Sequence, residues 1–284
     1  MAFKTLISIE GLLQNLNRPD WVVVDCRFHL DQPEKGWQDY LASHIPGAVY
    51  AHLEEHLSGP VVPGKTGRHP LPSKEEFAAL AGSWGISEGT QVVVYDDEAG
   101  KIAARLWWMM RWADHEAVAV LDGGLPAWTA GGGPLSSEVP QIEGREFIPA
   151  YRSTMVATAE EILRHFGDPA YLLVDSRSLE RFRGDEEPID PIAGHIPGAK
   201  NYFWKSNISS RGTFEIKDML RGRFAVLFEH VPPGNVIFYC GSGVTAAVNV
   251  LAVTHAGYDV PKLYPGSWSE WITDPQRPIT TGSI

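Results

Sequence analysis

The residues best suited to chemistry in this sequence form the run Tyr239-Cys240-Gly241-Ser242-Gly243-Val244-Thr245-Ala246. The cysteine ends an apolar run, and a glycine-rich loop and an apolar, helix-like stretch follow it. Because Gly241 and Gly243 tolerate positive φ, successive backbone N–H groups of the loop can point inward and hold an anion. The N-terminus of the following helix adds positive potential, which favours a thiolate over a thiol. The Ser242 and Thr245 hydroxyls can donate further hydrogen bonds, so the pattern predicts a nucleophilic sulfur beside an anion-binding loop.

A single cysteine at a strand end is often only a small buried hydrophobic residue. We assign that role to Cys26, which lies in Val22-Val-Val-Asp-Cys-Arg-Phe28 with no glycine-rich loop after it. Cys240 differs because strand, cysteine, Gly-x-Gly loop and helix all line up. With two cysteines in the chain, neither a disulfide framework nor a cysteine-rich zinc site is expected.

Two covalent chemistries fit a thiolate in such a loop. Cysteine-dependent phosphatases place an arginine six residues after the cysteine to hold the phosphate oxygens, but that residue here is Ala246, and 240–256 contains no arginine. The alternative is attack on a sulfur atom, which leaves a persulfide on Cys240. The persulfide is a smaller anion that the loop can hold, and its outer sulfur then passes to an acceptor.

The elements that must position this loop follow from the hydrophobic pattern. VVVD at 22–25, VVVY at 92–95, LLVD at 172–175 and VIFY at 236–239 are continuous apolar runs, typical of strands buried on both faces of a parallel sheet. Helical patterns cover 74–81, 102–113, 160–166 and 246–256, the last ended by Gly257. This alternation predicts an α/β fold, with helices flanking mostly parallel central sheets and Cys240 at a carboxyl strand end, where such sheets bind ligands.

The pattern occurs twice along the chain. His44-Ile-Pro-Gly-Ala48 recurs as His195-Ile-Pro-Gly-Ala199, and Leu121-Asp-Gly-Gly-Leu-Pro-Ala-Trp128 recurs as Tyr264-Pro-Gly-Ser-Trp-Ser-Glu-Trp271. The apolar runs recur in the same order, so we interpret the chain as two copies of a module of about 140 residues, an ordinary domain size. The Gly-, Pro- and Ser-rich segment that begins at Gly131 marks the boundary between the copies. We expect an N-terminal domain at 1–140, a linker at 141–153 and a C-terminal domain at 154–284.

The first copy has Asp96 where the second has Cys240, within Tyr95-Asp-Asp-Glu-Ala-Gly-Lys101. A carboxylate cannot carry sulfur, so we expect the N-terminal domain to be inactive and to help close the pocket. The neighbouring acids could suggest a metal site, but we interpret them as a solvated acidic loop.

The net charge of the chain limits the kinds of molecule that it is expected to bind. Of 284 residues, 24 are Lys or Arg and 35 are Asp or Glu, a net charge of −11, which disfavours nucleic-acid binding but leaves small anions possible. The apolar N-terminal stretch is interrupted by Lys4, Glu10 and Gln14, so we predict no signal peptide. No run approaches a membrane span, and we expect a cytoplasmic protein.

These motifs resemble the rhodanese superfamily of sulfurtransferases in its tandem-domain form, over nearly the whole chain. HIPGA in both halves is similar to the family's N-terminal signature, and 263–271 to its C-terminal signature. The loop 240–246 resembles that of 3-mercaptopyruvate sulfurtransferases, since thiosulfate sulfurtransferases of the vertebrate kind carry Arg-Lys after the cysteine.

The resemblance also implies how the anionic donor is held. Arg181, in Asp175-Ser-Arg177-x-x-x-Arg181, matches the family's donor-binding arginine, and its planar guanidinium suits a carboxylate or sulfonate. A surface ion pair with Glu180 or Glu186 is the alternative role. Mercaptopyruvate enzymes usually have a second arginine where this chain has Asp190, and Arg183 is a possible substitute. The loop backbone at Gly241, Gly243, Val244 and Thr245 completes the expected binding site.

The family also has a Ser-His-Asp relay. Ser242 matches the serine, and His69, in Gly-Arg-His-Pro-Leu-Pro72, matches the histidine. His52 stands where the acid is expected, so the imidazole would be oriented less well, and a surface loop role for His69 remains open. His44, His195, Trp128 and Trp271 occur in both halves and are therefore expected to be structural, as are the strand-end residues Asp25 and Asp175.

The preferred hypothesis is a sulfurtransferase that moves a sulfane sulfur from thiosulfate or 3-mercaptopyruvate through Cys240 to cyanide, a small thiol or a thioredoxin-like acceptor. It requires no metal and no organic cofactor. A non-catalytic persulfide carrier or regulatory module is the alternative, and a phosphatase the third hypothesis. The loop favours mercaptopyruvate, whereas Asp190 disfavours it.

Overall fold

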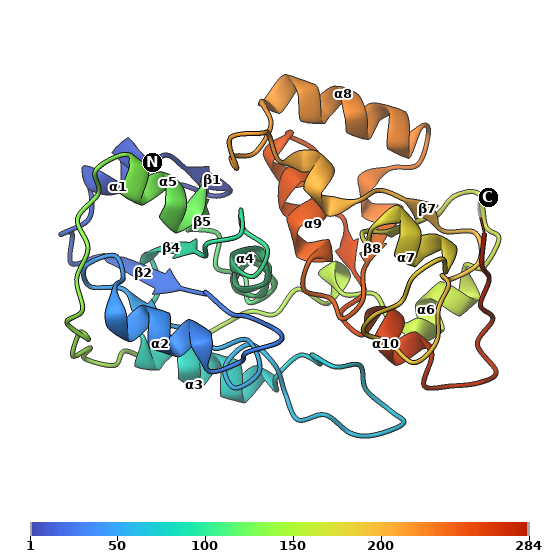
Figure 1. Ribbon diagram of the computed structural model, residues 1–284, viewed down its shortest axis with the longest axis horizontal. Coiled ribbons are helices and arrows are strands. Elements are labelled where there is room, and N and C mark those ends of the chain that lie inside the picture. The colour runs from blue at the N-terminus through green and yellow to red at the C-terminus, as the bar shows by residue number, and fades with distance from the viewer. Residues whose placement is uncertain (1, 283–284) are drawn as a thin grey trace. The chain divides into compact units, whose positions relative to one another are not determined.

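The four apolar runs form central strands of two sheets in the computed structural model, which describes residues 2–282 (Figure 1). The first sheet has the order β1-β5-β4-β2-β3 and the second β7-β6-β8-β9, and every recorded pairing within them is parallel. The strands are β1 (Leu6–Ile7), β2 (Trp21–Asp25), β3 (Val49–Tyr50), β4 (Gln91–Tyr95), β5 (Val118–Leu121), β6 (Leu172–Asp175), β7 (Lys200–Asn201), β8 (Val236–Tyr239) and β9 (Lys262–Leu263).

Helices connect the strands, as the alternating pattern predicts. They are α1 (Ile9–Leu13), α2 (Lys35–Ala42), α3 (Lys74–Ser83), α4 (Ala103–Trp112), α5 (Gly124–Ala130), α6 (Ala159–Arg164), α7 (Leu179–Arg183), α8 (Lys217–Phe228), α9 (Ala246–His255) and α10 (Ser267–Trp271), with short 3-10 turns at Ser153–Met155, Trp204–Asn207 and Pro233–Asn235. The four predicted helices are confirmed, with small shifts at their ends. Helix α3 begins where Ser73 and Glu76 form a capping box, and α9 is followed by Gly257 at φ +89°.

The chain divides into two compact units whose boundaries interleave. The first holds the described residues up to Gly59, then Pro72–Arg152 and Ser209–Phe214. The second holds Pro60–Leu71, Ser153–Ile208 and the described residues from Glu215 onward. Each unit therefore includes a segment from the other half of the sequence. As a result, His69 belongs to the same unit as Cys240.

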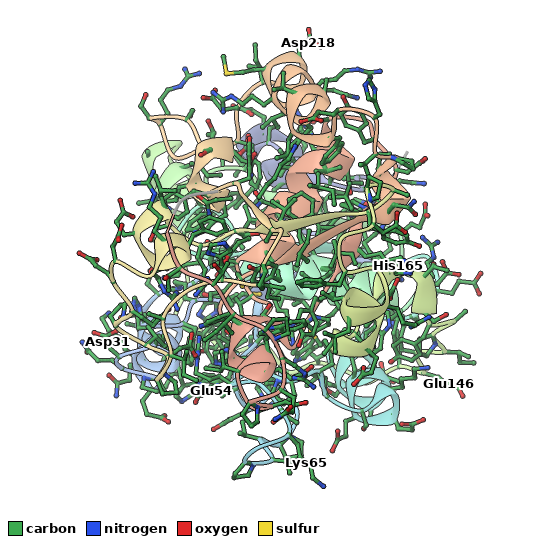
Figure 2. All side chains as sticks on the ribbon, turned by 90° about the vertical axis from the view of Figure 1, so that its right-hand side faces the viewer. Asp31, Glu54, Lys65, Glu146, His165 and Asp218 are labelled. Atoms are coloured by element: carbon green, nitrogen blue, oxygen red, sulfur yellow. The ribbon has the colours of Figure 1, made fainter. Side chains whose placement is uncertain are left out.

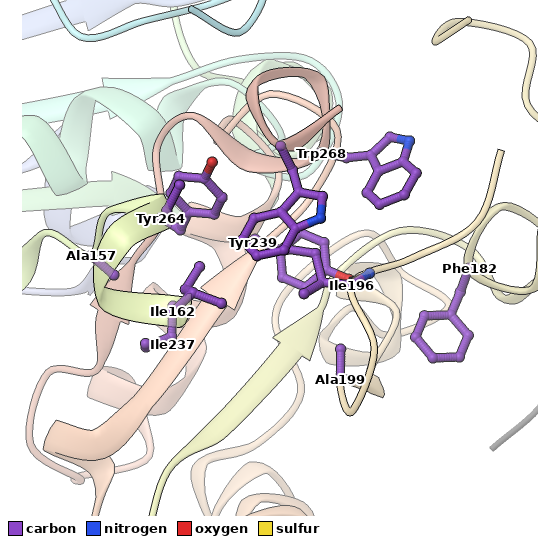
Figure 3. Packing of buried hydrophobic residues seen from close by; sticks show 11 residues of the cluster. Ala157, Ile162, Phe182, Ile196, Ala199, Ile237, Tyr239, Tyr264 and Trp268 are labelled. Carbon is purple, nitrogen blue, oxygen red and sulfur yellow. Dashed lines mark hydrogen bonds between the residues drawn. The ribbon is translucent and has the colours of Figure 1, made fainter. Parts of the chain in front are cut away.

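Both central strands β4 and β8 are buried along their whole length, which confirms the prediction of strands covered on both faces. In the second unit, one face of the sheet packs against α6, α7 and α10. Figure 3 shows this cluster, in which Ile162 of α6 and Trp268 of α10 pack with Ile237 and Tyr239 of β8. Helix α9 packs against β8 and β9.

The residues repeated in both halves serve the fold. Each HIPGA motif forms a turn, with Gly47 and Gly198 at positive φ. His44 Nδ1 lies 2.7 Å from the Tyr40 carbonyl and His195 Nδ1 lies 2.6 Å from that of Phe182. Both histidines are buried, as are Trp128 and Trp271, and Asp25 and Asp175 end their strands, so the structural roles predicted for these residues are confirmed.

Some charged side chains lie at the outer surface. Figure 2 shows Asp31, Glu146 and Asp218 there, and all three are exposed. Among residues 2–282, no helix has both the length and the apolar composition needed to cross a membrane.

Candidate active site

Cys240 directly follows β8 and is buried, with 2% of its surface exposed. Its N–H donates to Ser267 Oγ at 3.1 Å. The carbonyls of Cys240 and Gly241 accept from the N–H groups of Trp268 and Ser269 at 3.0 and 2.9 Å. The loop carbonyls are thus turned toward the first turn of α10.

Several N–H groups of the loop remain available as donors. Within the described chain, no partner is recorded for the N–H groups of Gly241, Ser242, Val244 and Thr245. Unpaired buried N–H groups are costly and rare. An anion on the cysteine sulfur is a chemical species that such groups can bind.

The two glycines of the loop have different roles. Gly243 has φ +73°, and a Cβ there would lie 2.2 Å from the Pro265 carbonyl oxygen, so both conformation and space require glycine. Gly241 is not among the residues at positive φ. Its missing side chain instead leaves room for arginines. The Thr245 hydroxyl makes no capping bond to α9.

Two guanidinium groups lie over Gly241. A Cβ at that position would be 2.9 Å from Arg68 Nη2 and 3.5 Å from Arg181 Nη2. Arg181, which lies in the middle of α7, was predicted from the sequence, but Arg68 was missed. Arg68 lies directly before His69 in a segment without regular secondary structure, and no local feature of the sequence marks it as a ligand of the site.

Buried acids hold these arginines. Arg181 donates to Glu187 at 2.6 Å and to Asp190 at 3.1 Å. The ion pair with Glu180 or Glu186 that the sequence suggested is therefore wrong. Asp190 also forms an ion pair with Arg68. Burial raises the pKa of Asp190, although the arginines oppose that shift. Burial also acts to raise the pKa of Glu187, but hydrogen bonds from Arg181 and from backbone N–H groups hold it below its usual value.

The predicted serine and histidine are in contact. His69 Nδ1 lies 2.8 Å from Ser242 Oγ, and both residues are buried. The Arg68 N–H donates to Ser269 Oγ at 3.1 Å, which anchors this segment beside the loop. His69 is therefore not a surface residue. A proton can move between imidazole and hydroxyl at this distance.

The roles considered for His52 and Arg183 are not tested by the contacts of the described residues. His52 lies in the first unit, where its Nδ1 accepts from the Glu55 N–H and its Nε2 lies 3.3 Å from the Pro33 carbonyl oxygen. For Arg183, no contact between its side chain and the loop is recorded in the described chain, so its role in donor binding stays a prediction.

The corresponding loop of the first unit differs from our expectation. Asp96 is fully buried, so the interpretation of a solvated acidic loop is wrong for it. Its carboxylate accepts from the N–H groups of Glu98, Gly100, Ile102 and Ala103 at 2.8–2.9 Å. Burial raises the pKa of Asp96, against the effect of these four bonds.

Cys26 is also fully buried, and burial raises the pKa of its thiol well above the usual value. This confirms its assignment as a small hydrophobic residue rather than a nucleophile. The two cysteines thus differ in surroundings as the sequence predicts.

One cluster in the first unit has potential metal ligands: Glu34, His52 and Glu55, whose ligand atoms lie within 4.8 Å of one another. His52 Nδ1 already accepts a hydrogen bond from the Glu55 N–H, and its Nε2 lies 3.3 Å from the Pro33 carbonyl oxygen.

Comparisons with known proteins show which family this chain resembles. A model of the rhodanese-like domain matches residues 8–131 and 158–274. The chain is similar to a probable 3-mercaptopyruvate sulfurtransferase of Pseudomonas aeruginosa, 44% identical over 99% of this chain and 100% of that protein. It is also similar to a putative thiosulfate sulfurtransferase of Mycobacterium tuberculosis, 42% identical over 99% of this chain and 98% of that protein. Among solved structures, a 3-mercaptopyruvate sulfurtransferase from Leishmania major is 30% identical with a TM-score of 0.84, covering 97% of this chain and 76% of that one.

Proposed function

The chain belongs to the rhodanese family as a tandem-domain sulfurtransferase, and we propose that it moves a sulfane sulfur through a persulfide on Cys240. The donors are 3-mercaptopyruvate and thiosulfate. The observation that carries this proposal is Cys240 at the end of β8, beside the N–H groups of Gly241, Ser242, Val244 and Thr245, for which no acceptor is recorded among residues 2–282.

With thiosulfate the first step is a displacement at sulfur. The Cys240 thiolate attacks the outer sulfur, the S–S bond of the donor breaks, and sulfite leaves with the electron pair. The Cys240 persulfide anion remains, next to the N–H groups of 241–245. Cyanide, a small thiol or a thioredoxin-like protein then attacks the outer sulfur and restores the thiolate.

With 3-mercaptopyruvate the C–S bond breaks instead. The electron pair goes to carbon as the enolate of pyruvate, and the thiol proton of the donor must reach that carbon. Ser242 and His69 support this transfer, because their side chains are 2.8 Å apart and can pass one proton. His69 and Ser242 act in this proposal as proton carriers beside the nucleophile Cys240.

The remaining assignments follow from the same chemistry. Residues 1–140 contribute no nucleophile, since Asp96 stands in place of the cysteine, and 154–284 contribute the reacting sulfur. The reaction needs no metal or organic cofactor. A reducing compartment such as the cytoplasm suits a thiol that must return to its reduced form in each cycle.

The direct test is thiocyanate formation from cyanide, with each donor and with Cys240→Ser as the control. We expect turnover with both donors in the parent protein and none in the variant. A reactive Cys240 that takes up sulfur but never releases it to cyanide would contradict the proposal and favour the persulfide-carrier alternative.

A further inference from the structure

We propose that Arg68 and Arg181 together bind the anionic group of the sulfur donor, and that Asp190 is the positioning residue that holds this pair over Gly241. The inference deepens the proposed function and rests on it for the identity of the donor. It concerns residues of one compact unit only, since 60–71 and 153–208 both belong to the second.

The hydrogen bonds divide the guanidinium nitrogens into two groups. Arg68 uses Nη1 for Asp190, and Arg181 uses Nε and Nη2 for Glu187 and Asp190. Arg68 Nη2 and Arg181 Nη1 have no recorded partner in the described chain. These two nitrogens lie 2.9 and 3.6 Å from the position of a Cβ at Gly241, so both donors are presented beside the residue that follows the reactive cysteine.

Asp190 makes this pairing possible. Its side chain is only 2% exposed and contacts both arginines. Two guanidinium groups from different segments repel each other unless an anion lies between them, and a buried carboxylate is tolerated when it is paired on both sides. An arginine at position 190 would face Arg68 and Arg181 as a like charge. Asp190 is thus compatible with a second donor-binding arginine, which comes from position 68.

The charges around this pair are balanced. Arg68, Arg177 and Arg181 face Asp175, Glu187 and Asp190 through recorded ion pairs, three positive groups against three negative ones. A site without net charge attracts a doubly charged anion less than a site with surplus arginines does. The arrangement therefore favours a singly charged carboxylate donor over a dianion such as thiosulfate.

Binding can be measured separately from turnover in the Cys240→Ser protein, using calorimetry with thiosulfate and with 3-mercaptopyruvate. Adding Arg68→Ala should weaken the binding of each donor about tenfold, the range expected for a charge-assisted hydrogen bond. Arg164→Ala, which removes an exposed arginine of α6, is the matched control and should change nothing. Unchanged donor binding in Arg68→Ala would overturn the inference.

Kinetics then test the positioning role of Asp190. In the protein with Cys240 intact, Arg68→Ala should raise KM about tenfold with little change in kcat. Asp190→Asn should raise the ratio of kcat/KM for thiosulfate to that for 3-mercaptopyruvate, since it removes one negative charge. The double variant Arg68→Asp with Asp190→Arg should have a KM between that of the parent protein and the higher KM of Arg68→Ala. An unchanged donor ratio in Asp190→Asn and no recovery in the exchange would exclude the positioning role.

The two proposals fail differently. If the parent protein forms no thiocyanate but Arg68→Ala still weakens donor binding, the proposed function falls and the anion-binding pair stands. If the parent protein is active and Arg68→Ala binds donors normally, the pair falls and the function stands.

Discussion

The loops after β4 and β8 have similar backbone contacts, but they differ in whether their own side chain supplies an anion to their N–H groups. In the first, the Asp96 carboxylate occupies the ring of N–H groups and accepts four hydrogen bonds from it. In the second, Cys240 takes the same place, and several N–H groups of its loop have no recorded partner in 2–282. The first loop therefore contains its own anion, whereas in the proposed reaction the second loop binds the anion that forms on Cys240.

The surrounding backbone supports this correspondence. The Leu125 N–H donates to the Asp96 carbonyl at 2.8 Å, and the Trp268 N–H donates to that of Cys240 at 3.0 Å. The residues before them, Gly124 and Ser267, have φ +58° and +55°. The fold thus supplies an anion-binding loop in each copy, and the residue at the strand end decides whether that loop can do chemistry.

Exchanging the strand-end residue should produce the largest effect. In Cys240→Asp, sulfur transfer should fall by at least about 1000-fold, because the nucleophile is gone. The new carboxylate should accept loop N–H groups as Asp96 does, so the free energy of unfolding should exceed that of Cys240→Ala by about 1 kcal/mol. A thiocyanate assay measures the loss of sulfur transfer, and urea unfolding measures the difference in the free energy of unfolding. A Cys240→Asp protein less stable than Cys240→Ala would show that the two loops are not equivalent.

The side chains two residues after Asp96 and Cys240 have different partners. Ser242 lies within hydrogen-bond distance of His69, whereas Glu98 forms an ion pair with Lys101 at 2.7 Å. The variant His69→Ala tests what this difference does. Only the transfer from 3-mercaptopyruvate requires a proton to move, so kcat/KM for this donor should fall about 100-fold. For thiosulfate the loss should stay within about threefold. Equal losses for both donors would assign His69 a structural role.

The fold was predictable because the buried runs and the repeated motifs are local signals. VVVY and VIFY carry the strand assignment in their own residues, and Gly257 marks the end of α9. Cys240, Ser242 and Arg181 could be found in the same way, since each lies in a recognisable motif. The comparisons show the family and leave these individual roles as predictions.

Arg68 and the burial of Asp96 could not be predicted because neither has a local signal. Arg68 lies in a segment without regular structure, and only the folded chain brings it to Gly241 and Asp190. Asp96 looks solvated beside Asp97 and Glu98, since the sequence does not reveal four N–H groups directed at one carboxylate. Both cases depend on backbone geometry rather than on residue type.

Removing the internal anion should cost stability rather than activity. Asp96→Ala leaves four buried N–H groups without an acceptor, so we expect the free energy of unfolding to fall by about 2 kcal/mol. Glu98→Ala, at the exposed neighbouring position, should change it by less than about 0.5 kcal/mol. Activity per folded molecule should stay the same in both. If Asp96→Ala matched Glu98→Ala in stability, the carboxylate would not be what holds the first loop together.

The smallest effect should appear in the pH dependence of stability. Because burial raises the pKa of Asp96 in the folded state above the ordinary value of 3.8, the folded protein binds this proton more tightly than the unfolded chain does. The stability from this group is therefore complete below pH 3.8 and declines as the pH rises through the folded-state pKa. Asp96→Asn lacks this titration. The difference in unfolding free energy between the parent protein and Asp96→Asn should thus shift in favour of the parent as the pH falls toward 3.8. A shift in the opposite direction would mean that the four N–H bonds lower the pKa of Asp96 by more than burial raises it.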